Sequence, residues 1–259
     1  MKFRVKILLL ILLTLICVIG TFLFDPVPQN PSFHKFSDRN QILGIPNGLN
    51  VLSNLPFIAV GIMGLLSLKR SAIIQSLAVI YFLLFTGIIL IGLGSGWYHL
   101  SPDNNSLVYD RIPMTIVFMA FLSAVVAECI DVNAGVRLLF PLIVIGIASV
   151  LYWYYTESIG RGDLRLYGLV QFYPMVAIPA ILLLFPSPAN KRTWRLLPWI
   201  LIWYAIAKIF EQFDFDIYDA TGFVSGHSLK HIAAAVAAWY MVKVVRVKSK
   251  IPAKTHVNH

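Results

Sequence analysis

The sequence predicts an all-α protein, a polytopic membrane helix bundle. Hydrophobic residues account for 58% of the 259 residues and charged residues for only 13%, which is about half the charged fraction of a soluble domain. The mean hydropathy is +0.77. The apolar residues gather into stretches of roughly twenty residues, the length that a helix needs to cross a bilayer. The chain therefore suits a single membrane bundle rather than several soluble domains.

Apolar stretches follow one another along the chain and are separated by hydrophilic breaks. We expect membrane-spanning helices at about 5–24, 48–68, 73–99, 109–129, 136–155, 166–185, 195–213 and 225–244. The breaks fall at 25–46, 69–70, 101–106, 131–133, 156–165, 186–193 and 214–222. The two cysteines, Cys17 and Cys129, both lie in apolar stretches. They provide neither a disulfide framework nor a cysteine-based metal motif.

The first apolar stretch has two interpretations. Lys2, Arg4 and Lys6 precede it, as in a signal peptide, but the stretch is long and no clear small-x-small cleavage site follows it. We favour an uncleaved N-terminal transmembrane anchor over residues 1–25, with a signal peptide as the alternative. The rest of the chain then divides into a seven-transmembrane core over 26–245 and a basic cytoplasmic tail over 246–259.

The distribution of the basic residues predicts the topology. The net charge of +9 could indicate a nucleic-acid partner, but the basic residues cluster just beyond the ends of apolar stretches, which is a topology signal. Eight spans place both termini on one side. Of the 21 basic residues, the opposite loops hold only Lys35, Arg39, Arg161 and Arg165, while Arg111, Lys208 and Lys230 lie in or at the ends of spans. The positive-inside rule then makes both termini cytoplasmic, and we expect no nucleic-acid partner.

Three histidines fall near the ends of apolar stretches, where an uncompensated polar ring is expensive. His227 and His231 are four residues apart, so they lie on one face of a helix. With His99 from another span, they make up three of the four ligands of a tetrahedral zinc site and leave the fourth position for water. The predicted topology puts all three near the non-cytoplasmic face. For a single histidine, a hydrogen bond between helices is the alternative.

Two further polar residues converge on the histidines. Ser95 precedes His99 by one helical turn, so both share a face. The break at 101–106 then turns the chain, and antiparallel neighbours bring Asp110 back beside His99. As alternatives, Asp110 caps a helix that opens at Arg111, and Ser95 is a small residue that permits close helix packing.

This pattern resembles the alkaline ceramidase family, within the wider superfamily of membrane hydrolases that includes the progestin and adiponectin receptors. The matching residues are Ser95-x3-His99, Asp110 eleven positions later, and His227-x3-His231. Residues 50–57 also resemble the opening of that family's first core helix. The resemblance covers roughly 38–245 and implies a seven-helix ceramidase-like core, with 5–24 as an extra N-terminal transmembrane helix. The basic N-terminal anchor and the departures from the eukaryotic pattern indicate a bacterial member in the inner membrane, with its site towards the outer face.

The resemblance implies a zinc-dependent intramembrane hydrolase that cleaves the amide bond of a ceramide or similar acyl-lipid, which enters from the bilayer. His99, His227 and His231 would bind Zn²⁺, which activates a water molecule. Asp110 would take a proton from that water and pass it to the leaving amine, and Ser95 would donate a hydrogen bond to the oxyanion. Where the eukaryotic enzymes have an acidic calcium-binding segment, residues 36–47 contain one carboxylate and an arginine, which makes Ca²⁺ doubtful.

A second polar set lies near the last two spans. Lys208 and Glu211 are three residues apart, and Lys230 could reach an acid on the neighbouring helix. Ionisable groups at membrane depth are functional candidates. We favour a clamp between helices, and the alternative is a polar wall that binds a lipid headgroup. Similarly, the outer loop at 157–165 is either solvated or in contact with headgroups.

Two other functions compete with hydrolysis. One is a receptor- or haemolysin-III-like seven-transmembrane protein with a structural or signalling zinc site. The other is a metal or proton transporter, in which broken helices and charges near mid-membrane would be more typical. Ser95 and Asp110 favour the hydrolase, because a structural zinc site needs neither residue. The sequence does not predict the oligomeric state.

Overall fold

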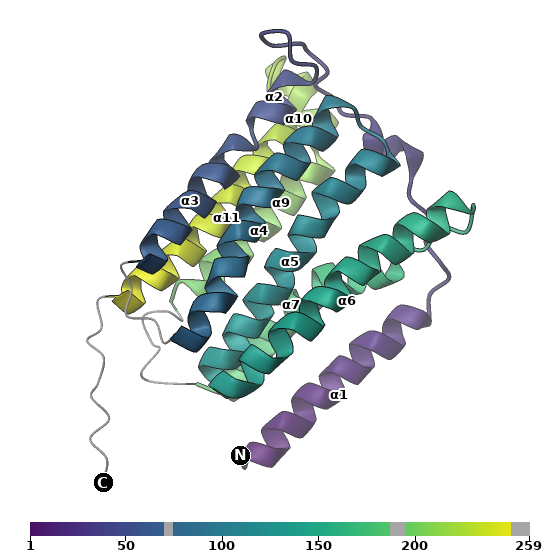
Figure 1. Ribbon diagram of the computed structural model, residues 1–259. Coiled ribbons are helices and arrows are strands. Elements are labelled where there is room, and N and C mark those ends of the chain that lie inside the picture. Colours follow the sequence, from purple (N-terminus) through teal and green to yellow (C-terminus); the bar gives the residue numbers. More distant parts are fainter. Residues whose placement is uncertain (70–74, 187–194, 250–259) are drawn as a thin grey trace.

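The computed structural model describes residues 1–69, 75–186 and 195–249, and its regular elements are all helices (Figure 1). The protein is therefore an all-α polytopic bundle, as predicted. Its long helices are α1 (Phe3–Phe22), α3 (Leu55–Lys69), α4 (Gln75–Leu100), α5 (Asn104–Cys129), α6 (Val132–Ser158), α7 (Arg165–Leu184), α9 (Leu197–Gln212) and α11 (Gly226–Ser249). The short ones are η1 (Pro31–His34), α2 (Gly48–Leu52) and α10 (Asp214–Thr221).

The predicted spans all contain helices. Within the described ranges, seven helical segments are long and apolar enough to cross a membrane, with α2 and α3 acting as one segment. The predicted span at 195–213 corresponds to α9, which has 16 residues and packs along α11. Counting α9, the bundle has the predicted seven core segments and the extra N-terminal helix. The last residues of the predicted tail, 250–259, lie outside the described part of the chain.

Helix α5 begins earlier than predicted, and this corrects one interpretation of Asp110. Asp103 caps the helix: its Oδ1 accepts a hydrogen bond from the Ser106 backbone N at 2.6 Å, and its own backbone N donates to Ser106 Oγ at 3.0 Å. This reciprocal pair is a capping box. Asp110 consequently lies about two turns inside α5, and the alternative in which it caps a helix opening at Arg111 is wrong.

The two ends of the bundle differ in what they carry. The first turn of α1 and the last turn of α11 lie at one end, and α2 and α10 lie at the other (Figure 1). We call the second the histidine end, because His99 lies in the last turn of α4 and His227 in the first turn of α11. Helix α1 lies at the edge of the bundle against α7, where the Thr14 and Tyr173 hydroxyls are 2.6 Å apart. None of its residues is buried.

The linker between α1 and α2 folds over the histidine end instead of leaving it open. Phe36 is buried, and the Ser37 backbone N donates to Asp214 Oδ2 at 3.0 Å. The loop between α6 and α7 packs on the same linker: Glu157 Oε2 accepts a hydrogen bond from the Gln29 backbone N at 3.0 Å. Asp163 in this loop is only 2% exposed. The prediction of a solvated loop is therefore wrong for this part of it.

Candidate metal centre and active site

The structure brings His99, His227 and His231 together at the histidine end. One nitrogen from each ring lies within 4.8 Å of the others, and the Nε2 atoms of His99 and His231 are 3.3 Å apart. The ring centroids are 4.8 to 4.9 Å apart in every pair. The residues are only 1%, 5% and 3% exposed, respectively. Three buried imidazoles at this separation form a group that could hold a metal ion.

Hydrogen bonds determine which nitrogen of His231 is available as a ligand. Its Nδ1 lies 2.8 Å from Ser53 Oγ, whereas the Asn54 amide lies further away, at 3.4 Å. Ser53 donates its single hydroxyl proton to the Asn50 carbonyl oxygen at 3.1 Å. In this arrangement Ser53 accepts from Nδ1–H of His231. This leaves the lone pair on Nε2, which faces His99, as is usual for a metal-binding imidazole.

The other two histidines are also held in place. The Asn47 amide donates to the His99 carbonyl oxygen at 2.8 Å, and the His227 backbone N donates to Asp214 Oδ1 at 2.8 Å. The Phe36 ring lies 4.6 and 4.5 Å from the rings of His99 and His227, so it shields both from solvent. This donor set of three imidazoles, with a lone pair directed inwards, fits Zn²⁺ in its usual tetrahedral geometry.

The supporting polar residues of α2 and of the turn that follows it were not predicted as part of the site. Asn50 Oδ1 accepts hydrogen bonds from the hydroxyls of Ser225 and Ser228 at 3.2 and 2.9 Å, which ties α2 to the start of α11. Asn50, Ser53 and Asn54 are spaced three and four apart, which places them on one helical face. That spacing within an apolar stretch was the signal that could have identified them.

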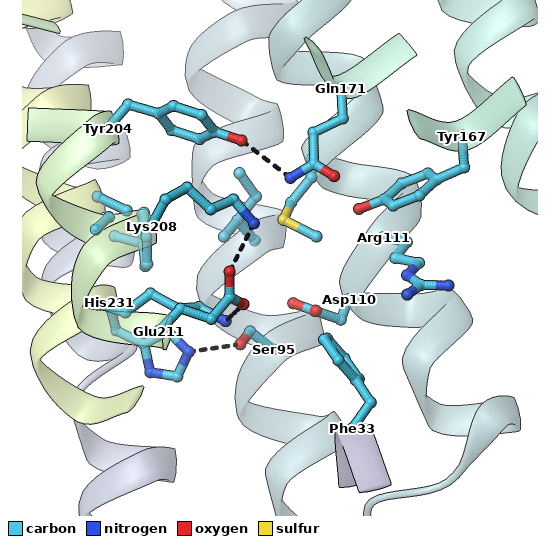
Figure 2. A pocket seen from close by; sticks show the side chains of 16 residues that line it. Phe33, Ser95, Asp110, Arg111, Tyr167, Gln171, Tyr204, Lys208, Glu211 and His231 are labelled. Atoms are coloured by element: carbon cyan, nitrogen blue, oxygen red, sulfur yellow. Dashed lines mark hydrogen bonds and ion pairs between the residues drawn. The ribbon is translucent and has the colours of Figure 1, made fainter. Parts of the chain in front are cut away.

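Close contact between α4 and α5 places Asp110 beside Ser95. Pro113 has no backbone N–H, so it leaves the Tyr109 carbonyl oxygen without its usual helical partner. This carbonyl packs against Gly94, where a Cβ atom would collide with it. Ser95 and Asp110 flank this contact and line one cavity with His231 (Figure 2). Ser95 Oγ lies 3.5 Å from His231 Nε2.

The cavity beside the histidines contains several charged groups, and we call it the polar cavity. Its volume is about 130 Å³. Glu211 accepts hydrogen bonds from Lys208 at 2.6 Å and from Lys230 at 2.8 Å (Figure 2), so the predicted pair exists and the neighbouring helix joins it. Lys230 Nζ also lies 3.2 Å from His227 Nε2. Because an ammonium group is only a donor, this nitrogen of His227 also carries a lone pair.

A second cavity, the apolar cavity, adjoins the first. Its volume is about 100 Å³, and its lining includes no charged side chain. Helices α3, α4, α5, α7, α9 and α11 contribute to both cavities. Gln171 Nε2 donates to the Tyr204 hydroxyl at 2.9 Å near the boundary between them. The residues that line both cavities are Phe57, Ile91, Met114, Tyr204 and Ala234.

The residues that correspond to a calcium-binding segment offer a single carboxylate to that cation. Asp38 is the only carboxylate in 36–47, and its Oδ1 already accepts from the Asn40 backbone N at 2.9 Å. Its Oδ2 is buried without a hydrogen-bond partner. The Asn50 oxygen is taken by two serines. Ca²⁺ usually takes six to eight oxygen ligands, several of them carboxylates, and this segment supplies only one carboxylate.

The fold and the site define a polytopic membrane protein with a buried three-histidine centre beside a charged cavity. A family model described as Ceramidase matches residues 45–257, which is most of the chain. The protein belongs to the ceramidase family, as the sequence predicted. No curated protein matches the chain. Family membership supports a lipid amide hydrolase in the membrane.

Proposed function

We propose that the protein is a zinc-dependent amidohydrolase that cleaves the linear amide bond of a ceramide, or a similar sphingolipid-like acyl-lipid, within the membrane. One observation carries this proposal: Ser95 and Asp110 line the same cavity as His231, whose Nε2 faces His99. A structural metal site requires neither a serine nor a further carboxylate beside its ligands. Hydrolysis requires both a proton acceptor and a donor to the oxyanion.

Each residue has a defined role in the proposed reaction. His99, His227 and His231 would hold Zn²⁺, which would supply a Lewis acid and an acidified water at neutral pH. Asp110 accepts the proton of the attacking water as the new carbon–oxygen bond forms. Ser95 donates its hydroxyl proton in a hydrogen bond to the carbonyl oxygen, which becomes negative. Asp110 then gives the proton to the amide nitrogen as the carbon–nitrogen bond breaks, and the products are a fatty acid and an amine.

The two adjoining cavities match the two chemical parts of such a substrate. The apolar cavity is lined by residues such as Ile88, Phe121 and Ile178 and takes the acyl chain. The polar cavity takes the amide and the amine portion, beside Ser95 and Asp110. Because both cavities lie among membrane-spanning helices, the lipid enters from the bilayer without leaving an apolar environment.

The proposal includes a topology and a division of the chain. The termini face the cytoplasm of a bacterial cell, and the histidine end faces the outer side of the inner membrane, because most basic residues lie beyond the opposite ends of the helices. Residues 1–25 are a retained anchor, 26–245 the catalytic core and 246–259 a basic tail. Retention is supported by the bond from Arg165 Nη1 to the Phe24 carbonyl oxygen at 2.7 Å. Reporter fusions that put Arg161 and Lys191 on the same side would contradict this topology.

The proposed function is tested with purified protein in vesicles. The metal content is measured by mass spectrometry, and fatty-acid release is measured from a panel of ceramides and other N-acyl lipids. We expect about one zinc per chain and release from at least one amide, abolished by a chelator and restored by Zn²⁺. His231→Ala is expected to lose both the metal and the activity, whereas His34→Ala, which changes a histidine away from the centre, should keep the metal.

Two outcomes would contradict the proposal. Full zinc retention in His231→Ala would exclude this residue as a ligand. Zinc-loaded protein that hydrolyses no lipid in the panel would favour the receptor-like alternative, in which the metal has a structural or signalling role.

A further inference from the structure

The polar cavity has an excess of positive side chains. Arg111, Lys208 and Lys230 line it, against the two carboxylates of Asp110 and Glu211. Glu211 is shared between both lysines, so a single negative charge offsets two positive ones. A divalent metal beside this cavity would only add to the positive charge. Unless a ligand compensates for it, such an excess is expensive inside a membrane protein.

Arg111 is the least compensated of these cations. It is only 4% exposed, and no carboxylate of the described residues forms a salt bridge with it. Its guanidinium lies 4.1 Å from the Trp153 ring centroid and 4.6 Å from that of Tyr167, and Nη2 donates to Gln29 Oε1 at 2.6 Å. Its Nη1 is buried without a hydrogen-bond partner. Aromatic rings stabilise the cation but do not satisfy this donor.

Lys208 is the accessible member of the set. Its side chain is 38% exposed, whereas those of Glu211 and Lys230 are each 21% exposed. Its Nζ is directed towards Glu211 from the α9 side of the cavity, and the Arg111 guanidinium lies across the cavity beneath Tyr167 (Figure 2). A group bound between them would meet hydrogen-bond donors from α5 and α9.

We propose that the substrate carries an anionic group, a carboxylate or a phosphate, on its amine portion, and that Arg111 and Lys208 bind this group. The inference rests on the proposed amide hydrolysis and specifies its substrate class. The acyl side of the amide needs no cation, because the adjoining apolar cavity is uncharged. The anion therefore belongs to the part of the substrate that remains in the polar cavity. Charge-assisted hydrogen bonds of this kind contribute more than neutral ones.

A matched pair of substrates tests this inference. N-dodecanoylglycine and N-dodecanoylethanolamine have the same acyl chain and amide, but only the first has a carboxylate on the amine portion. We expect kcat/KM to be at least about tenfold higher for the glycine derivative, in the range expected for a hydrogen bond to a charged group. High salt should reduce the difference, since screening weakens attraction at a partly exposed lysine.

Variants of Lys208 identify the binding group. Lys208→Gln should lower the ratio of the two kcat/KM values about tenfold, while Lys208→Arg, which keeps the charge, should preserve it. Lys230 still pairs with Glu211 in both variants, which favours correct folding. Lys243→Gln is the control, because Lys243 lies over the Trp239 ring on α11, away from the polar cavity, and it should leave the ratio unchanged.

The outcomes separate this inference from the proposed function. Hydrolysis of both amides with equal kcat/KM, or with a preference for the ethanolamine derivative, would overturn the anionic substrate class and leave amide hydrolysis intact. Dodecanoate could also inhibit the wild type but not Lys208→Gln, while the two kcat/KM values are equal. That result would assign the cations to binding of the fatty-acid product and would also overturn the anionic substrate class. Hydrolysis of neither amide, nor of any ceramide, would be a failure of the proposed function itself.

Discussion

The polar and apolar cavities are built from the same six helices but contain opposite chemistry. Five charged side chains line the polar cavity, whereas only uncharged ones line the apolar cavity. Along α11, His227, Lys230 and His231 occupy the first two turns, and Ala234, Ala238 and Met241 continue the same face deeper in the bundle. The two cavities therefore differ in the types of residue at successive turns of one helical face, and not in the helices that form them.

This difference shows that the buried polar groups, which cost free energy to desolvate, are concentrated at one end of the bundle. Near the histidine end, many polar atoms have a specific partner: Ser53 for His231, Asp214 for the His227 backbone and Glu211 for two lysines. His99 Nδ1 and Arg111 Nη1 are buried there without one among the described residues. Deeper in the bundle, the packing relies on van der Waals contacts, which drive helix association in lipid. The chemistry is concentrated at one membrane depth, and the rest of the bundle holds it there.

The largest expected effect comes from removing the proton acceptor of the polar cavity. Asp110→Asn should lower kcat by about 10²–10⁴-fold, the range for the loss of a general acid–base group, while the metal content stays near that of the wild type. Steady-state hydrolysis and metal analysis on the same preparation measure both. Asp103→Asn is the control on the same helix, since asparagine also caps well. A normal kcat in Asp110→Asn would remove this residue from the mechanism.

A smaller effect is expected from the group that orients His231. Ser53→Ala removes the acceptor for Nδ1–H and should weaken zinc affinity by about 10–100-fold, as is usual for the partners of ligating histidines. Competition with a chromogenic chelator measures the affinity. Ser149→Ala serves as a control, because Ser149 is also a buried helical serine but bonds only to the Gly146 carbonyl oxygen. Equal zinc affinity in the two variants would show that the Ser53 contact does not support the metal.

The apolar cavity is tested by filling it. Ala238→Phe places a large ring in a space of about 100 Å³ and should lower kcat/KM about tenfold for long acyl chains, roughly the effect of one or two methylenes in an apolar pocket. Short chains should be affected less. Rates over a series of acyl lengths measure this change in preference. Ile232→Phe, on the exposed face of α11, is the matched control, and an identical profile for the two variants would argue against an acyl chain in this cavity.

The smallest effect concerns the loop that holds the linker over the site. Hydrogen bonds from the Arg165 guanidinium hold the pKa of Asp163 below its usual value. A depressed folded-state pKa stabilises the fold above the unfolded pKa of about 4, and this contribution is lost as the pH falls through the folded value. Asp163→Asn should therefore lower Tm by a few degrees at pH 7, with the difference shrinking as the pH drops below about 4. Thermal melts in detergent over a range of pH measure the Tm of both proteins. A Tm difference that stays constant with pH would exclude a charge effect.

The sequence predicted the bundle and the convergence of the histidines well, because both depend on local periodicity. Stretches of twenty apolar residues specify spans, and a four-residue spacing specifies a shared face whatever the surroundings. The pairing of Lys208 with Glu211 was predicted by the same rule. The helix boundaries were less accurate: the capping box at Asp103 starts α5 before the apolar stretch does, and the hydrophilic residues of α10 form a helix of their own.

The contacts that depend on long-range packing were not predicted. Phe36 lies in a polar linker, and nothing in its neighbourhood indicates that it packs on two histidines. Arg111 was noted only as a charge near the end of a span, because its aromatic surroundings come from η1, α6 and α7. The linker between α1 and α2 folds over the bundle and brings such residues together. Its sequence has no hydrophobic periodicity from which these contacts could be predicted.

The central claim is that His99, His227 and His231 bind one zinc ion that the hydrolysis needs. X-ray absorption at the zinc edge tests it most directly, because it counts the ligands and measures their distances in the active preparation. We expect three histidine nitrogens at about 2.0–2.1 Å and one oxygen, and no bound zinc in His231→Ala. A spectrum with sulfur ligands, or one unchanged in His231→Ala while hydrolysis continues, would contradict it.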